Sequence, residues 1–196
     1  MYSKDLTDKH YKIVNYKKGE VIYEPDHHPR YVYFVKSGEV RMFTVNDEGK
    51  EFTQGVFKSD QYFGEPALLL NRPYLAYTVA LQDAELVLMD QAQFQQLIEE
   101  DKGFSMELIR TLSDRLFYKS MMLEELANEQ ADHRLSTLIN YLGRELQAGE
   151  VLNITRQALA DMSGLRVETV IRAIKKLADE GKIKLIRGKI VKTNMT

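Results

Sequence analysis

Three charged side chains near the C-terminus repeat at a spacing that suits the reading of DNA bases. Glu168, Arg172 and Lys175 lie at i, i+4 and i+7, so on a helix they share one face. In a major groove, an arginine can donate to O6 and N7 of guanine, and a glutamate can accept from N4 of cytosine. The stretch therefore predicts a helix whose outer face reads base edges.

A helix–turn–helix would position this face. Thr155 is a typical N-cap for a first helix, Ala160 is small where two helices approach, and Gly164 supports the turn. In the second helix, Val170 and Ile174 form the apolar side that packs on the first. The following "KIKLIRGKIVKT" predicts two short strands with a tight turn, and this order of elements is that of a winged helix.

Arg166 breaks the local rule for helix starts. It stands where the second helix should have a Ser, Thr, Asp or Asn cap, and a cation there opposes the helix dipole. A nearby phosphate would supply the missing negative partner. The alternative is a poor cap on a surface loop.

Charge is distributed unevenly along the chain. Residues 133–196 contain 12 Lys and Arg against six Asp and Glu, whereas residues 1–132 contain 15 against 23. A basic tail beside an acidic body indicates that the tail meets a polyanion, and a solvated surface is the alternative reading.

Composition excludes several classes of protein. The 196 residues are 44% hydrophobic and 29% charged, as in ordinary globular proteins, and include no cysteine for disulfides or thiolate metal sites. No apolar run reaches membrane-spanning length and "MYSKDLTDKH" lacks a signal core, so we expect a cytoplasmic protein without a membrane partner. His27 and His28 are adjacent, so on a strand they would point to opposite faces and would not share a metal. Glu65 lacks a catalytic partner. We expect no metal, no cofactor and no enzymatic activity.

Residues from Tyr11 to about Met89 form short β-rich runs separated by turn signals. Examples of these breaks are 36–38, 46–49 and 71–73. This spacing predicts a small antiparallel barrel or sandwich.

A helical period follows, and from Glu107 to Gln130 the apolar residues recur at alternating steps of three and four. Only Lys119 and Gln130 interrupt this seam. It is typical of a parallel two-stranded coiled coil between protomers, but also of a helix packed on its own β-domain. The expected dimer-seam residues are Ile109, Leu112, Leu116, Leu123 and Leu126.

These segments, in this order, resemble the CRP/FNR family of bacterial transcription regulators. The resemblance runs from about Val14 to the C-terminus. It rests on "ITRQ", "ETV-R" and "L--EGKI" within residues 154–183, and on "VYFVKSGEVRMF", "DEGKE" and "DQYFGEPALL" in the N-terminal half. It implies a cyclic-nucleotide-binding-like β-roll, a dimerisation helix and a winged helix–turn–helix.

The resemblance also implies which side chains meet DNA. Arg156 and Gln157 should contact the backbone, and the segment 168–172 should reach bases or adjacent phosphates. Val167 makes this site similar to the FNR branch, whereas Ile171 departs from the small residue common at its position. The expected DNA-binding residues are Thr155, Arg156, Gln157, Arg166, Glu168, Thr169, Arg172 and Lys175.

The nucleotide pocket departs from the family pattern. In cAMP-binding members, a Gly-Glu pair holds the ribose and an Arg-Ser/Thr-Ala run holds the phosphate. Here Tyr74-Leu75-Ala76 stands opposite that run, so its cation and hydroxyl are missing, and Pro66 removes a backbone N–H. The pocket is either vestigial and filled, or binds something else. The candidate pocket residues are Gly64, Glu65, Tyr74, Leu75, Lys119 and Ser120.

We therefore predict an α+β protein with a jelly-roll-like antiparallel β-roll over residues 1–98, a long dimerisation helix over 99–131 and a winged helix–turn–helix over 132–196. It would bind double-stranded DNA as a homodimer on an inverted repeat and would not be switched by cAMP. RNA polymerase is a partner that the resemblance implies. The alternative is a ligand-binding receptor module whose basic C-terminal tail contacts a protein.

Overall fold

The computed structural model describes residues 11–127 and 130–192, and the chain divides into two units, residues 1–108 and 109–196. The boundary falls inside the long helix α4 (Lys102–Ala127). The first turns of α4 pack in the first unit, and its remainder belongs to the second.

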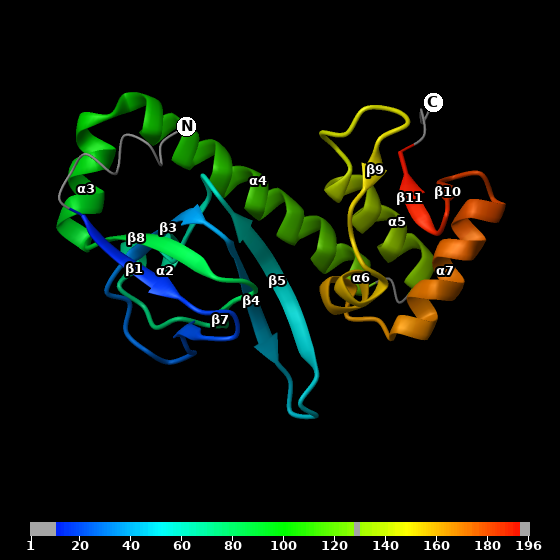
Figure 1. The fold of residues 1–196 in the computed structure, drawn as a ribbon, viewed down its shortest axis with the longest axis horizontal. Coiled ribbons are helices and arrows are strands. Elements are labelled where there is room, and N and C mark those ends of the chain that lie inside the picture. The colour runs from blue at the N-terminus through cyan, green and yellow to red at the C-terminus, as the bar shows by residue number, and fades with distance from the viewer. Residues whose placement is uncertain (1–10, 128–129, 193–196) are drawn as a thin grey trace. The chain divides into compact units, whose positions relative to one another are not determined.

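The first unit contains two four-stranded antiparallel sheets (Figure 1). The first sheet has the order β1-β8-β3-β6 and the second has the order β2-β7-β4-β5. The strands are β1 (Lys12–Tyr16), β2 (Val21–Tyr23), β3 (Val32–Ser37), β4 (Glu39–Val45), β5 (Glu51–Lys58), β6 (Tyr62–Phe63), β7 (Tyr77–Ala80) and β8 (Ala84–Met89). Two helices, α2 (Glu65–Leu70) and α3 (Gln91–Glu100), complete the unit together with the start of α4.

Strand β3 is buried on both faces because it lies between two apolar layers. Successive side chains of a strand point to opposite faces. Tyr33 stacks on Phe63 within one cluster of the β-roll core, at a ring-centroid distance of 5.1 Å. Its neighbour Phe34 instead meets Phe94 of α3 and Phe104 of α4, at 6.4 and 6.1 Å. The helices therefore cover one face of the first sheet, and the other face belongs to the core of the roll.

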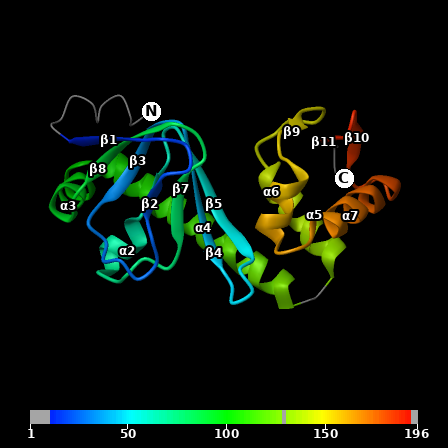
Figure 2. The same cartoon turned by 60° about the horizontal axis from the view of Figure 1, so that its bottom comes forward.

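Beyond the remainder of α4, the second unit contains three helices and a small antiparallel sheet (Figure 2). The helices α5 (Ala131–Leu142), α6 (Arg156–Ser163) and α7 (Val167–Asp179) contact one another pairwise. Apolar side chains of all three helices and of the sheet form one core, with Leu135, Leu159 and Ile174 among its fully buried members.

The small sheet is built on a two-residue hairpin. Strands β10 (Lys184–Ile186) and β11 (Lys189–Val191) pair so that Arg187 and Gly188 alone form the turn. Both turn residues have positive φ, 49° and 76°, as a hairpin turn of this length requires. A third strand, β9 (Val151–Leu152), pairs with β11 and was not predicted from the sequence, because two residues give no periodic signal.

The predicted fold class is confirmed. The chain has antiparallel sheets in its N-terminal half, one long helix, and a C-terminal helix–turn–helix with a small sheet.

Candidate nucleic-acid interface

The helix–turn–helix is held by a strong first cap and a weak second one. Thr155 caps α6, since its Oγ1 accepts a hydrogen bond from the backbone N–H of Ala158 at 3.0 Å. Gly164 ends α6 in the left-handed conformation, with φ of 68°. Arg166 is the N-cap of α7 and makes no side-chain capping bond. The first backbone N–H groups of α7 therefore receive no side-chain oxygen from this cap, as the sequence predicted.

The outer face of α7 carries the charged side chains that the sequence assigned to DNA. Glu168, Arg172 and Lys175 are all exposed, whereas Val170 and Ile174 are buried on the opposite face. Thr169, also assigned to DNA, is only partly exposed. The structure therefore brings three of the four assigned residues of this helix onto one open face.

Lys176 is not an open cation of this face, because it forms an ion pair with Asp132 of α5. The hydrogen bond from its ammonium group to Asp132 raises the pKa of Lys176. The open basic groups of the helix face are thus Arg172 and Lys175.

The two residues expected at the DNA backbone both make contacts within the protein. Arg156 Nη2 donates to the carbonyl of Gly188 in the wing turn at 2.7 Å, and burial lowers the pKa of its guanidinium. Gln157 Nε2 donates to Oδ1 of Asp161 at 2.7 Å, one turn along α6. Arg156 therefore links the start of α6 to the hairpin, a role that the sequence did not indicate.

The hairpin adds further exposed cations beside Arg156. Lys184, Arg187 and Lys189 are exposed, and none of them forms an ion pair with the residues that the structure describes. Sequence reasoning identified the basic charge of this tail but assigned no wing residue to DNA. The signal was present as three cations within the six residues "KLIRGK".

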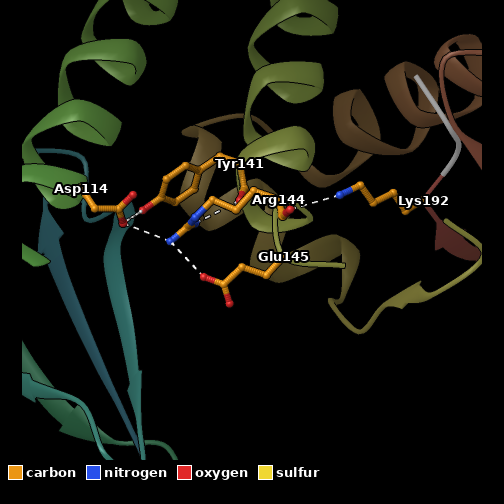
Figure 3. Close-up of polar contacts among 5 residues, drawn as sticks. All are labelled: Asp114, Tyr141, Arg144, Glu145 and Lys192. Atoms are coloured by element: carbon orange, nitrogen blue, oxygen red, sulfur yellow. Dashed lines mark hydrogen bonds and ion pairs between the residues drawn. The ribbon is translucent and has the colours of Figure 1, made fainter. Parts of the chain in front are cut away.

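The start of the second unit is fastened to α5 and the wing by a polar cluster (Figure 3). Tyr141 Oη and Arg144 Nη2 both donate to Oδ2 of Asp114 on α4, at 2.9 and 3.0 Å. The guanidinium of Arg144 lies 4.0 Å from the centroid of the Tyr141 ring. Lys192, directly after β11, donates to the carbonyls of Gly143 and Arg144 at 2.8 and 3.2 Å. Helix α4, helix α5 and the wing are therefore connected through side chains.

A second cluster joins the far end of α4 to α5 and α6. The buried carboxylate of Glu125 is 2.7 Å from Nδ1 of His133 and accepts from Oγ1 of Thr137 at 2.7 Å. Burial alone would raise the pKa of Glu125, but these hydrogen bonds outweigh it and lower the pKa. The guanidinium of Arg134 donates hydrogen bonds to the carbonyls of Glu125 and Ser163, at 3.3 and 3.2 Å. Sequence reasoning missed this junction, because it joins residues of three separate helices.

Helix α4 exposes most of the apolar seam that the sequence predicted. Leu116 and Leu123 are 67% and 70% exposed, and Leu112 is partly buried. Phe117, next to the seam, is also exposed. The remaining seam residues, Ile109 and Leu126, are exposed as well. An exposed row of large apolar side chains is unusual for a surface that stays in water.

The first unit places a tyrosine where the resemblance expects the phosphate-binding arginine. Tyr74 is only 5% exposed, and its ring stacks on Tyr23 at a centroid distance of 3.7 Å. Its hydroxyl donates to the carbonyl of Tyr31 at 3.3 Å. Burial raises the pKa of Tyr74 to about 12. This position therefore provides an aromatic core and no cation.

Leu75 corrects one expectation for the pocket. Its side chain is 84% exposed, so it does not line the interior of the roll. Neighbours in an extended segment point to opposite sides, and here Tyr74 and Ala76 are the buried ones.

The other pocket candidates divide between the two units. Gly64 caps α2 with φ of 90°, and a Cβ there would lie 3.2 Å from the carbonyl oxygen of Tyr31. Glu65, the first residue of α2, is fully buried. Lys119 and Ser120 lie on α4 in the second unit, and their position beside the roll stays a prediction.

The described part of the chain offers neither a metal-binding cluster nor a membrane span. Residues 11–127 and 130–192 contain no group of three or more histidine or acidic side chains placed to hold a metal. No described helix is both long and apolar enough to cross a bilayer.

Comparison with known domain families gives two matches. The cyclic nucleotide-binding domain matches residues 13–101, and the Crp-like helix-turn-helix domain matches residues 133–196. A β-roll of the first kind joined to a winged helix of the second defines a DNA-binding transcription regulator.

Individual relatives agree with this class. The chain is 29% identical to the cyclic AMP receptor protein of Thermus thermophilus over 186 residues, which cover 95% of this chain and 86% of the relative. It is 26% identical to the global nitrogen regulator of a Nostoc species, covering 91% and 83% of the two chains. A solved CRP/FNR-family regulator from Thermus thermophilus superposes with a TM-score of 0.65 at 29% identity, covering 92% of each chain.

The chain belongs to the CRP/FNR family of transcription regulators, and it binds DNA through its Crp-like helix–turn–helix. Members of this family are typically dimeric.

Proposed function

We propose that this regulator acts as a homodimer on an inverted-repeat DNA site and that cAMP does not switch it. The observation that carries the second part is Tyr74, which is buried and stacked on Tyr23 at the position of the expected arginine. A cyclic phosphate that leaves water needs a cation and several donors, or its desolvation opposes binding. The names of the relatives do not decide the effector, since one is a cyclic AMP receptor and another a nitrogen regulator.

The exposed seam of α4 supports the homodimer. Its positions follow at alternating steps of three and four residues, with Lys119 the interruption between Leu116 and Leu123, and this is the pattern by which two parallel helices pack. A two-fold dimer carries two reading helices, which suits a palindromic site with half-site centres about one helical turn apart. By family resemblance, RNA polymerase is the protein partner of the bound dimer. The division into a sensor at 1–98, a dimer helix at 99–131 and a reader at 132–196 is part of the same proposal.

Calorimetry with cAMP and cGMP, beside a DNA titration with and without each nucleotide, tests the effector. We expect no measurable heat from nucleotide and the same DNA affinity in its presence. Micromolar binding of cAMP coupled to a large gain in DNA affinity would overturn this part of the proposal.

Sedimentation equilibrium tests the dimer. Leu116→Glu and Leu123→Glu together should give a monomer, because two like charges per chain would meet in the seam. Leu70→Glu, at a comparably exposed leucine of α2, is the matched control and should stay dimeric. A wild-type monomer at micromolar concentration that binds a single half-site tightly would contradict the proposal.

A further inference from the structure

One apolar side chain interrupts the charged outer face of α7. Ile171 is 50% exposed, whereas the other exposed positions of this helix are all charged. A half-exposed isoleucine gains only part of its burial free energy in the free protein, and its branched Cβ lowers helix propensity slightly. Helix α7 is otherwise sharply divided into a buried apolar side and a charged side. The exception therefore lies on the face that meets DNA.

The helical period fixes the place of Ile171 on that face. With 3.6 residues per turn, Glu168 and Lys175 follow each other along the middle of the exposed side. Arg172 lies on one flank and Ile171 on the other. Beyond Arg172, the same flank ends at Lys176, which is held by Asp132. The apolar group and the open guanidinium are thus on opposite sides of Glu168.

The major groove offers one apolar group that would match this side chain. Guanine, cytosine and adenine present donors and acceptors there, while thymine adds its 5-methyl group. We propose that Ile171 contacts the 5-methyl of a thymine in each half-site, at a base pair other than the G·C pair read by Arg172. This inference rests on the proposed function, because it needs the outer face of α7 in a major groove.

Removal of a single methyl group from the DNA tests the contact. The preferred site is first selected from random double-stranded DNA with the full-length protein. Each thymine of its half-site is then replaced by deoxyuridine, which removes only the methyl group, and affinity is measured by fluorescence anisotropy. We expect one thymine per half-site at which the loss is about fourfold, the effect of exposing one methyl-sized group to water.

Two variants then assign that loss to a side chain. Ile171→Ala should bind the thymine and uracil sites equally well, because the partner of the methyl is gone. Ile186→Ala is the matched control, since Ile186 lies on β10 of the same unit and is 47% exposed. It should keep the full preference for thymine, which shows that the loss is specific to Ile171. An effect of uracil on DNA stiffness would persist in Ile171→Ala, so equal binding by that variant excludes it.

The outcomes separate this inference from the proposed function. If the selected site tolerates uracil at every position, or if Ile171→Ala keeps the preference for thymine, the contact is absent although DNA binding stands. If no sequence is selected at all, the groove-reading face is wrong and the contact is lost with it. The measurement on the wild-type protein needs no variant to fold.

Discussion

Two neighbouring residues of the first unit should respond in opposite ways to truncation. Tyr74 and Leu75 both occupy positions where the family resemblance expects phosphate ligands, but Tyr74 is buried and Leu75 is 84% exposed. We predict that Tyr74→Ala strongly destabilises the β-roll and that Leu75→Ala leaves it almost unchanged. This pair tests whether the interior of the roll is filled by the chain itself.

The contacts of Tyr74 set the size of the effect. Removing a fully packed aromatic ring costs about 3–5 kcal/mol through lost burial and the cavity that remains. Tyr74→Phe keeps the ring and removes only the hydroxyl that donates to Tyr31 at 3.3 Å, so we expect a cost of about 1 kcal/mol. For Leu75→Ala, as for most exposed positions, the change should stay within about 0.5 kcal/mol.

Urea denaturation provides the measurement. The chain has 11 tyrosines and no tryptophan, so tyrosine fluorescence can follow unfolding beside circular dichroism. The two units can unfold in separate transitions, and only one transition should shift in Tyr74→Ala. A loss of unfolding free energy below about 1 kcal/mol for Tyr74→Ala would falsify the filled interior, because removal of a packed aromatic ring costs several times more.

Three further predictions concern the DNA interface and the tyrosines. Arg172→Ala should cost about 1–3 kcal/mol per half-site and relax specificity at one G·C pair, as measured by binding to single-substitution sites. Arg156→Ala should weaken binding to all sequences alike and flatten the salt dependence, and it should also speed amide exchange in the wing, because the bond to Gly188 is lost. Burial raises the pKa of Tyr74, Tyr118 and Tyr141 from 10.0 to about 12. Between those pH values the folded state holds more protons than the unfolded state, so stability should fall as pH rises from about 10 to 12 in denaturation series, with ultraviolet absorbance following tyrosinate formation.

Regular patterns made much of the fold predictable. The caps and turns at Thr155, Gly164 and Arg187-Gly188 are local, because each depends on residues a few positions apart. The amphipathic period of α7 is equally local, and it is sufficient to predict that Arg172 and Lys175 lie on the exposed face.

Long-range contacts were not predictable in the same way. The carboxylate of Glu125 meets His133 and Thr137 across the end of α4, and no period in the sequence links these residues. Arg156 was assigned to phosphate by resemblance, but its partner in the free protein is a carbonyl 32 residues away. Such contacts depend on how elements pack, and pairwise packing leaves no mark in a single sequence.

Two departures from the family pattern look alike in the sequence and differ in the structure. Tyr74 replaces a cation, and Ile171 replaces a small residue, so each adds a large, mainly apolar side chain at a functional position. The ring of Tyr74 is buried and has its partners within the protein, in Tyr23 and Tyr31. Ile171 is half-exposed on a face that is otherwise charged. A side chain whose partners are internal fills its site without a ligand. An apolar side chain left in water is stabilised only when a partner covers it. We therefore expect the first change to separate this protein from cAMP and the second to determine which DNA it prefers.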